Sequence, residues 1–513
     1  MGAPIVYLIG AGPGDPGLMT VRGMECIAEA DVVVYDYLAN PRFLAGARED
    51  AELVYVGKKG FSKHITQDEI NALLVKKARE GGGSVVARLK GGDPFIFGRG
   101  GEEALALVEA DIPFEVVPGV SSGYAAPAYA GIPVTHRGIT TDVAFVTGHE
   151  DPNKETSDVK WDKLATAVGT ICFFMGVKNL PEISARLIEH GRSAETPVAL
   201  VRWGSTPRQE TLVGTLADIA EKAEEAQFKA PAITIVGDVV SLREQLTWFE
   251  AKPLFGRTIV VTRSRAQASE LSNRLIELGA EVLEFPVIQT VEPDSWEPVD
   301  EAIGNLETYD WVVFTSVNAV ETFFERMAVG EADARQLAGC RIAAVGPVTA
   351  ARCMDNGICP DYVPAEYRAE GVLEGFCDRG VGEGTRVLLP RALEAREVLP
   401  DSLREQGATV DVVPVYRTVP GQGEPGTLAR LAEGTIDVVT FTSSSTVKNF
   451  LELAEEGLPE GADVAELMSD VLVASIGPIT SDTARERGLE VGIQPEEYTI
   501  PGLVDVLVEH YTE

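Results

Sequence analysis

The sequence predicts an α/β protein with more than one domain. Over the first 250 residues, short apolar runs typical of strands alternate with helix-like segments of about 10 to 15 residues, which is the pattern of α/β layers. Beyond that point the chain repeats itself in three blocks. With 513 residues it is also too long for one hydrophobic core. We therefore expect an N-terminal α/β part followed by a duplicated α/β part.

The expected strands of the N-terminal part are β-like apolar runs. In chain order they are IVYLIG (5–10), DVVVYDYL (31–38), SVVARLK (84–90), FEVVPGV (114–120), DVAFVTGH (142–149), TICFFMG (170–176), PVALVRWG (197–204) and PAITIVG (231–237). The helical SLREQLTWFE (241–250) ends before Pro253 and Gly256, and a new strand begins at Arg257. We place a domain boundary near residue 252 after a first domain of residues 1–250, and we expect WFEAKPLFG (248–256) to be an exposed connection.

Three pairs of segments in the C-terminal part match in the same order. Residues 257–290 match 385–418 with an offset of 128, residues 311–324 match 438–451 with an offset of 127, and residues 343–358 match 474–489 with an offset of 131. This spacing is far longer than the period of a solenoid repeat. It predicts two similar α/β lobes.

The charge and the apolar pattern exclude several classes of partner. The 79 acidic and 44 basic residues give a net charge of −35, and such a surface repels nucleic acid. No apolar run approaches the roughly 20 residues that cross a bilayer, and Met1 leads into a strand without a signal-peptide pattern. We expect a cytoplasmic protein with neither a nucleic-acid nor a membrane partner.

The cysteines and histidines predict neither disulfides nor a metal site. The six cysteines are scattered without a C-x-x-C pair, and the five histidines show no ligand spacing. We expect buried, reduced thiols and no protein-bound metal.

Two glycine-rich loops follow expected strands. GAGPGDPG (10–17) begins like the dinucleotide fingerprint G-x-G-x-x-G, but its last position is Asp15 and Pro13 interrupts it. The loop is therefore about as well explained by a tight turn as by a ligand site. The second loop, GGDPFIFGRGGEE (91–103), is richer in glycine and charge than a turn requires.

Taken together, the N-terminal motifs resemble those of the tetrapyrrole methylases, and most closely the uroporphyrinogen-III C-methyltransferases. The resemblance covers residues 4–250 and rests on GAGPGD (10–15), GGDPF (91–95), GRGGEE (98–103), PGVSSGYAAPAYAGIPVTHRG (118–138) and PAITIVG (231–237). It implies S-adenosyl-L-methionine as cofactor, a tetrapyrrole substrate and a homodimer formed through this half.

The resemblance also implies the residues of a cofactor site. The GGD segment would approach the methionine part of the cofactor, with the Asp93 carboxylate facing its ammonium group. Ser121 and Ser122 stand where related sequences often have Thr-Ala, which puts the side-chain contact of Ser122 in doubt. The implied cofactor positions are Pro13, Gly91, Gly92, Asp93, Ile96, Ser121, Ser122, Met175 and Gly204.

Three further residues match the proposed catalytic positions of this family. Asp36 matches the proton acceptor, although an acid after a second strand can also bind a ribose in dinucleotide folds. Lys58 matches the proton donor, with a solvated lysine as the alternative. Arg99 would face the carboxylates of the substrate, for which a guanidinium fork is suited. Glu102 and Glu103 fit either a helix N-terminus or an active-site role.

The C-terminal half resembles uroporphyrinogen-III synthase over residues 253–513. The matching motifs are VVFTS (312–316) with the valine and phenylalanine that follow it, the two G-P-x-T blocks at 346 and 477, and PVYRT (414–418). The resemblance implies two α/β lobes with two crossings of the chain between them. One lobe would combine residues 253–292 with 419–513, and the other would be residues 293–418.

The same motifs suggest a cleft for a polyanion. Thr315 and Ser316, and likewise the residues 442–445, would begin helices whose exposed N–H groups can hold carboxylates, although helix capping explains each block as well. Tyr416 matches the tyrosine proposed to assist loss of the hydroxyl leaving group, with a packed strand residue as the alternative. Candidate cations are Arg263, Arg265, Arg391 and Lys448.

The two resemblances together predict a bifunctional enzyme of tetrapyrrole biosynthesis. It would cyclise hydroxymethylbilane to uroporphyrinogen III with inversion of ring D, and then methylate that product at C2 and C7 to precorrin-2. Precorrin-2 would feed cobalamin, sirohaem or related pathways. The alternatives are another tetrapyrrole-methylase activity and a C-terminal half that binds a ligand without catalysis.

Overall fold

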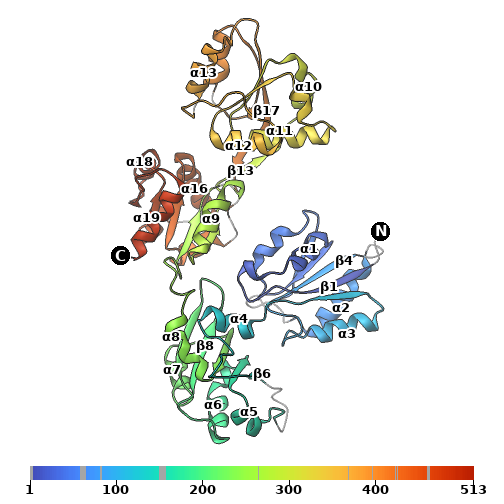
Figure 1. Ribbon diagram of the computed structural model, residues 1–513, viewed down its shortest axis with the longest axis vertical. Coiled ribbons are helices and arrows are strands. Elements are labelled where there is room, and N and C mark those ends of the chain that lie inside the picture. Colours follow the sequence, from blue (N-terminus) through green and yellow to red (C-terminus); the bar gives the residue numbers. More distant parts are fainter. Residues whose placement is uncertain are drawn as a thin grey trace. The chain divides into compact units, whose positions relative to one another are not determined.

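The computed structural model describes residues 4–57, 65–80, 84–149, 157–263, 265–367, 369–395, 397–421, 423, 426–458 and 463–512. The chain forms two compact units, one built mainly from Met1–Thr258 and the other mainly from Val282–Leu507. Five-stranded sheets with helices packed on them make up both units, which confirms the expected α/β fold class (Figure 1).

The first sheet is entirely parallel, with the strand order β3-β2-β4-β1-β5. Its strands are β1 (Ile5–Gly10), β2 (Val32–Tyr35), β3 (Glu52–Tyr55), β4 (Val85–Lys90) and β5 (Phe114–Val117). β3 is absent from the strands expected from sequence, because this edge strand is partly exposed along its length and lacks a continuous apolar run.

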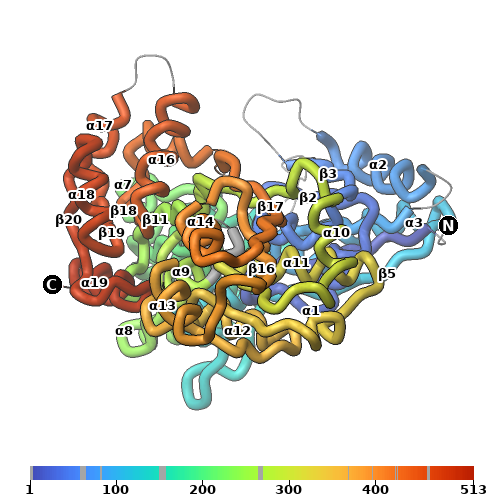
Figure 2. Tube along the Cα trace, turned by 90° about the horizontal axis from the view of Figure 1, so that it is seen from above, coloured from blue at the N-terminus to red at the C-terminus, as the bar shows by residue number. Residues whose placement is uncertain are grey.

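Helices cover both faces of this sheet. They are α1 (Val21–Glu29) on one face, and α2 (Gln67–Arg79) and α3 (Gly100–Glu109), side by side, on the other (Figures 1 and 2). Ile9 of β1 packs with Cys26 of α1, whereas its neighbour Leu8 packs with Leu74 of α2, as the alternation of a strand requires. Because all five strands run the same way, their carboxyl ends meet at one edge. The two glycine loops therefore lie at the same edge.

The second sheet is mixed, with the order β6-β7-β10-β8-β9. Its strands are β6 (Val143–Thr147), β7 (Thr170–Phe174), β8 (Pro197–Arg202), β9 (Glu210–Thr215) and β10 (Ala232–Val236). β10 runs antiparallel to both of its neighbours, whereas β6 and β7 are parallel. The packed helices are α4 (Ser122–Tyr129) on one face and α5 (Trp161–Ala167), α6 (Leu180–Glu189) and α7 (Ile219–Glu225) on the other.

The second unit contains two sheets of related order. The first, β12-β11-β18-β19-β20, comprises β11 (Thr258–Val261), β12 (Glu281–Glu284), β18 (Val438–Phe441), β19 (Leu472–Ser475) and β20 (Val491–Ile493). The other, β13-β17-β16-β14-β15, comprises β13 (Ile288–Val291), β14 (Trp311–Phe314), β15 (Arg341–Ala344), β16 (Arg386–Ala392) and β17 (Thr409–Pro420).

The helices of the second unit follow the same duplicated pattern. With the sheet containing β18 go α9 (Arg265–Glu277), α16 (Ser444–Gly457), α18 (Pro478–Glu486) and α19 (Ile500–Thr512), and α16 and α18 are neighbours in Figure 2. With the sheet containing β14 go α10 (Glu297–Gly304), α11 (Val317–Val329), α12 (Pro347–Asp355), α13 (Ala369–Asp378) and α14 (Val398–Glu405). In both lobes the motif FTS joins a buried strand to a helix.

Two paired strands lie at the expected lobe boundaries: β17 extends past residue 418, and β13 ends just before residue 292. β13 pairs antiparallel with the end of β17, with Ile288 opposite Pro420 and Val291 opposite Arg417. The two crossings of the chain therefore form one ribbon that extends the sheet of the second lobe. The pairing joins segments more than a hundred residues apart, so local sequence patterns do not indicate it.

The segment 248–256 is only partly the exposed connection that we expected, because Phe249 and Leu254 are buried whereas Trp248 is 47% exposed. Phe249 is 5% exposed and its ring lies 4.8 Å from that of Tyr129. The Glu250 carboxylate accepts hydrogen bonds of 2.6 Å from Gln209 and from Thr211, and it pairs with Arg243. The expected helix over 241–250 is a 3-10 turn at Asp238–Leu242 followed by the short helix α8 (Arg243–Leu246), and Leu254 between Pro253 and Gly256 is buried.

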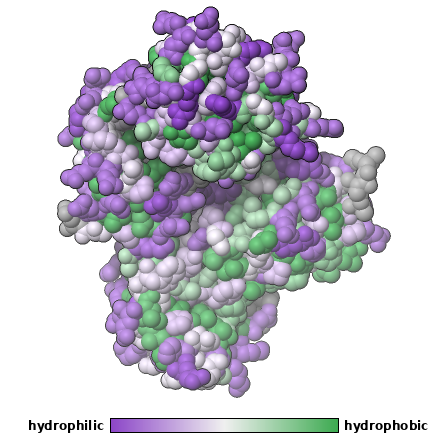
Figure 3. All heavy atoms as spheres, turned by 45° about the horizontal axis from the view of Figure 1, so that its top comes forward, coloured by the Kyte–Doolittle hydropathy of each residue, from purple (hydrophilic) through white to green (hydrophobic). Residues whose placement is uncertain are grey.

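No helix within the described ranges is long and apolar enough to cross a membrane. The face of the molecule in Figure 3 carries mainly hydrophilic side chains, with hydrophobic ones in smaller areas between them.

We predict that Phe249→Ala lowers the free energy of unfolding of the first unit by about 3 to 5 kcal/mol, because it leaves a cavity where a buried ring was. Denaturant unfolding monitored by tryptophan fluorescence measures the change. Leu246→Ala, at a side chain that is 46% exposed, is the matched control and should cost less than about 0.5 kcal/mol. Equal effects of the two substitutions would show that the connection is not packed.

Candidate active sites

Glycines allow the loops at the carboxyl edge of the first sheet to approach one another. Gly12 and Gly92 exchange backbone hydrogen bonds of 3.2 and 2.7 Å, so the loop after β1 lies against the loop after β4. A Cβ atom on Gly119 would lie 2.3 Å from the Gly92 oxygen, and one on Gly91 would lie 2.5 Å from the Cβ of Leu38. Backbone packing therefore requires some of the small residues that we expected to make room for a cofactor.

Asp93 joins two of these loops. One of its carboxylate oxygens accepts the N–H of Phe95 at 2.8 Å, and the other accepts the N–H of Gly119 at 3.0 Å. Each carboxylate oxygen has a second lone pair. Asp93 thus shapes the loop and can still accept a hydrogen bond from a ligand ammonium.

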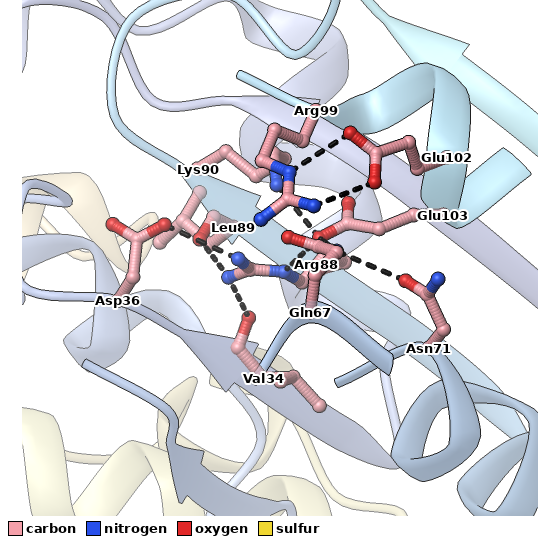
Figure 4. Close-up of polar contacts among 10 residues, drawn as sticks. All are labelled: Val34, Asp36, Gln67, Asn71, Arg88, Leu89, Lys90, Arg99, Glu102 and Glu103. Atoms are coloured by element: carbon pink, nitrogen blue, oxygen red, sulfur yellow. Dashed lines mark hydrogen bonds and ion pairs between the residues drawn. The ribbon is translucent and has the colours of Figure 1, made fainter. Parts of the chain in front are cut away.

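The Asp36 carboxylate is fixed through both of its oxygens. One accepts the N–H of Leu38 at 3.1 Å, and the other accepts a hydrogen bond of 3.2 Å from the Arg88 guanidinium (Figure 4). The Asp36 side chain is 26% exposed, whereas that of Arg88 is 3% exposed. A buried cation therefore holds a partly exposed carboxylate at the edge where the glycine loops meet.

Arg88 belongs to a buried group of charges on β4 and α3. Its Nε lies 3.2 Å from a Glu103 oxygen, and Lys90 Nζ lies 2.7 Å from the same oxygen. Glu103 is fully buried in the first turn of α3. Burial and the neighbouring Arg88 charge lower the pKa of Lys90, against the opposing effect of Glu103.

Arg99 and Glu102 form a separate, exposed pair. Two guanidinium nitrogens of Arg99 donate to the two Glu102 oxygens at 2.8 and 2.7 Å, and about half of each side chain is exposed. The structure thus distinguishes the adjacent glutamates of the motif. Glu102 faces outward beside Arg99, whereas Glu103 is part of the interior.

A cavity of 820 Å³ opens beside Arg99. Its lining includes Phe97, Arg99 and Glu102, together with Thr147 and Met175 of the second sheet. Phe97, Arg99 and Met175 have φ angles of +53°, +57° and +58°, which is unusual for residues with side chains. Such a conformation costs about 1–3 kcal/mol per residue and is most often retained at functional sites.

Ser205, which follows β8, and Tyr129, the last residue of α4, both contact the loop after β1. Ser205 Oγ accepts the N–H of Asp15 at 3.2 Å, and the Tyr129 hydroxyl donates to the Asp15 carboxylate at 2.6 Å. Burial and the Asp15 charge raise the pKa of Tyr129, which keeps the hydroxyl protonated as a donor. Pro13 lies within the loop that these contacts hold.

The remaining expected cofactor positions lie on the second sheet or at its border. Ser121 caps α4 by accepting the N–H of Gly123, and Ser122 is the first residue of that helix. A Cβ atom on Gly204 would lie 2.4 Å from that of Ala126, so α4 passes close to this strand end. Ile96 packs against the core of the second sheet.

The structure therefore brings most of the expected methylase residues to one region. Lys58 lies outside the described residues. Arg88, Lys90 and Tyr129 are additional polar residues of this region that were not expected from the sequence. Two cations in SVVARLK, an otherwise apolar run that becomes a central strand, were the available signal for the first two.

In the second unit, Tyr416 is a packed strand residue whose hydroxyl contacts Ser316. Its ring belongs to the core of the second lobe and is 9% exposed. Its hydroxyl lies 3.1 Å from Ser316 Oγ, which caps α11 by accepting the N–H of Ala319 at 3.2 Å. The Tyr416 side chain is therefore packed in the core, and its hydroxyl lies at the N-terminus of α11.

The hydroxyls of the other FTS motif are engaged in capping. Ser443 and Thr446 form a capping box at the start of α16, and Ser443 Oγ also lies 2.9 Å from Ser445 Oγ. The candidate cations differ in environment. Arg391 is buried and pairs with Glu397, burial lowers the pKa of Arg263, and Lys448 is exposed. The side chain of Arg265 lies outside the described residues.

Comparisons with known proteins divide the chain as the two units do. The family model of tetrapyrrole (corrin/porphyrin) methylases matches residues 5–220. That of uroporphyrinogen-III synthase HemD matches residues 269–505.

Three relatives extend these matches. Porphyrin biosynthesis protein HemD of Ruminiclostridium josui is 38% identical over 506 residues, which is 98% of this chain and 97% of the relative. A uroporphyrinogen-III C-methyltransferase of Bacillus subtilis (strain 168) is 45% identical over 333 residues, or 65% of this chain and 68% of the relative. An S-adenosyl-L-methionine-dependent uroporphyrinogen III methyltransferase of Methanosarcina barkeri is 54% identical over 241 residues, or 47% of this chain and 94% of the relative.

These matches confirm the resemblances seen in the sequence. The chain belongs to the family in which an S-adenosylmethionine-dependent uroporphyrinogen-III C-methyltransferase is fused to a uroporphyrinogen-III synthase.

Proposed function

We propose that this chain cyclises hydroxymethylbilane to uroporphyrinogen III with inversion of ring D and methylates that product twice, at C2 and C7, to precorrin-2. The observation that carries the methylase half of this proposal is the Asp36 carboxylate, which Arg88 and the Leu38 N–H hold beside the glycine loops. The domain limits, the site residues, the homodimer and the cytoplasmic location expected from the sequence belong to the same proposal.

The residues at the edge of the first sheet fit S-adenosylmethionine. Gly92 has a φ of +70°, and a Cβ atom there would meet nothing closer than 3.9 Å, so this backbone borders open space. Asp93 would accept from the ammonium group, while Pro13, Ser121, Met175 and Gly204 would border the rest of the molecule. When bound, S-adenosylmethionine supplies an electrophilic methyl group on its sulfonium.

Asp36 would take the proton that the macrocycle loses after its carbon has accepted the methyl group. A carboxylate held through both oxygens keeps one orientation during this transfer, and its partial exposure leaves it open to the substrate. Lys58 would return a proton where the reaction needs one.

Arg99 would bind a carboxylate of the substrate. Its present partner Glu102 is three residues away and half exposed, so a substrate carboxylate can replace Glu102 at little cost. Arg99 has a left-handed backbone conformation, and it lines the border of the cavity. Arg99 would thus orient the macrocycle over the residues described above.

In the synthase half, Tyr416 would donate a hydrogen bond to the hydroxyl that leaves hydroxymethylbilane. Ser316 orients the Tyr416 hydroxyl from the start of α11. The N-terminal amides of α11 and α16 would hold carboxylates of the substrate.

A homodimer through the methylase half would cover exposed apolar side chains of α3, of which Leu105 is 64% and Val108 is 56% exposed.

We predict that Asp36→Asn reduces kcat of methylation by about 10²- to 10⁴-fold, because the amide cannot take the proton. Arg99→Ala should mainly raise KM for uroporphyrinogen III. Methyl transfer from labelled S-adenosylmethionine and ring closure of hydroxymethylbilane are assayed separately, and ring closure should not change. Arg186→Ala, which removes a half-exposed arginine on α6, is the matched control. Near-normal methylation by Asp36→Asn would remove the assignment of Asp36 as base.

We also predict that Tyr416→Phe slows ring closure and lowers the fraction of isomer III, because spontaneous closure gives isomer I. The matched control is Tyr309→Phe, which removes another tyrosine hydroxyl of the same lobe, one that donates to Asp411 at 2.8 Å. Isomer analysis by chromatography should show normal isomer III for the control. An unchanged isomer ratio in Tyr416→Phe, or an equal loss in both variants, contradicts a catalytic role for Tyr416. Isomer I alone from the unmutated chain would favour a ligand-binding half without catalysis.

A further inference from the structure

Two cations are buried side by side on the face of β4 that α2 and α3 cover. Arg88 and Lys90 are two residues apart, so their side chains leave the strand on the same face. They are 3% and 5% exposed, respectively. Taking a charge out of water is unfavourable unless a close partner compensates it. The identity of that partner decides what these cations do.

Glu103 is the partner of both cations, and only one of its two carboxylate oxygens contacts them. One of its carboxylate oxygens accepts hydrogen bonds from Arg88 Nε at 3.2 Å, from Lys90 Nζ at 2.7 Å and from the Gln67 amide at 3.3 Å (Figure 4). The other oxygen is buried, and none of the described residues forms a hydrogen bond with it. A single buried carboxylate therefore faces two buried cations.

Asp36 supplies the second negative charge. It lies at the open end of the group, with Arg88 between it and Glu103, as Figure 4 shows. Arg88 also donates to the backbone oxygens of Leu89 at 2.9 Å and Val34 at 3.5 Å, which fix its position. The charge of Arg88 is thus divided between Glu103 behind it and Asp36 in front of it.

We propose that the buried Lys90–Glu103 pair sets how strongly Arg88 holds the Asp36 carboxylate, and thereby how basic Asp36 is in the methylation step. Lys90 and Glu103 are positioning residues in this account, since neither contacts Asp36 directly. The inference rests on the proposed role of Asp36 as base.

The arrangement gives two substitutions opposite signs. Lys90→Met leaves the Glu103 charge to Arg88 alone, so Arg88 holds Asp36 more weakly and Asp36 accepts a proton at higher pH. Glu103→Gln leaves the Arg88 charge to Asp36 alone, so Asp36 accepts a proton at lower pH. A residue with a purely structural role would reduce the rate without moving the pH dependence in a direction set by its charge.

Other ionisable groups near Asp36 and Glu103 are unchanged in these variants. Tyr55 of β3 interacts with Asp36, and burial together with that charge raises its pKa. Tyr35 and Tyr37 also interact with Tyr55, and Asp68 and Glu102 interact with Arg99. Because they are common to all the variants, they do not produce opposite shifts.

The experiment records kcat of methylation of uroporphyrinogen III against pH for the full chain, with S-adenosylmethionine saturating. We expect the acidic limb to move up by about half a pH unit or more in Lys90→Met and down by a similar amount in Glu103→Gln, the order expected for a unit charge in a partly buried site. The double variant should return toward the unmutated profile. The control is Lys77→Met, which removes a lysine of α2 that pairs with Glu52 and Glu80. It should not move the acidic limb.

Two further measurements separate the possible failures. Circular dichroism and calorimetric titration with S-adenosylhomocysteine show whether a variant is folded and binds the cofactor product. If one single variant is unfolded, the other carries the test, because the direction in which its acidic limb should move is fixed by the charge that it loses. The inference is overturned if Asp36→Asn is inactive but the acidic limbs of the Lys90→Met and Glu103→Gln profiles move in the same direction or do not move. Full methylation by Asp36→Asn would instead overturn the proposed function.

Discussion

The close approach of the glycine loops at the carboxyl edge of the first sheet is the constraint on which the methylase site depends. Gly92 exchanges backbone hydrogen bonds with Gly12 on one side, and on the other side Gly119 lies so close that a Cβ atom on Gly119 would come within 2.3 Å of the Gly92 oxygen. These contacts fix the backbone that carries Asp93 and, through Leu38, the backbone that follows Asp36. A parallel sheet brings such loops to one edge, but only the absence of Cβ atoms lets them touch.

Charge is organised differently in the two halves. The methylase half places Arg88, Lys90 and Glu103 in its interior, where the energy of each charge depends on its neighbours. In the synthase half, hydroxyls and helix N-termini predominate at the FTS motifs, with Tyr416 as the group whose hydroxyl reaches one of them. The first arrangement is suited to controlling a proton transfer, and the second to holding an anionic substrate.

The sequence predicted the fold class and, through its motifs, the loops that meet at the first sheet, because both depend on local patterns. Apolar runs predicted most of the strands, and the repeated blocks predicted two related sheets. Tertiary pairing accounts for what was missed. β3 and β13 are held by neighbouring strands rather than by apolar runs of their own, and Phe249 is buried by residues distant in the chain. The separate roles of Glu102 and Glu103 likewise depend on the face of α3 that each occupies.

The central claim is that one chain carries out both ring closure and double methylation. Anaerobic incubation of the purified chain with hydroxymethylbilane and S-adenosylmethionine, followed by mass spectrometry and absorbance of the products, tests it most directly. The account predicts precorrin-2, with two added methyl groups, and a transient amount of uroporphyrinogen III. Accumulation of unmethylated uroporphyrinogen I, or of uroporphyrinogen III with no methyl transfer, would contradict it.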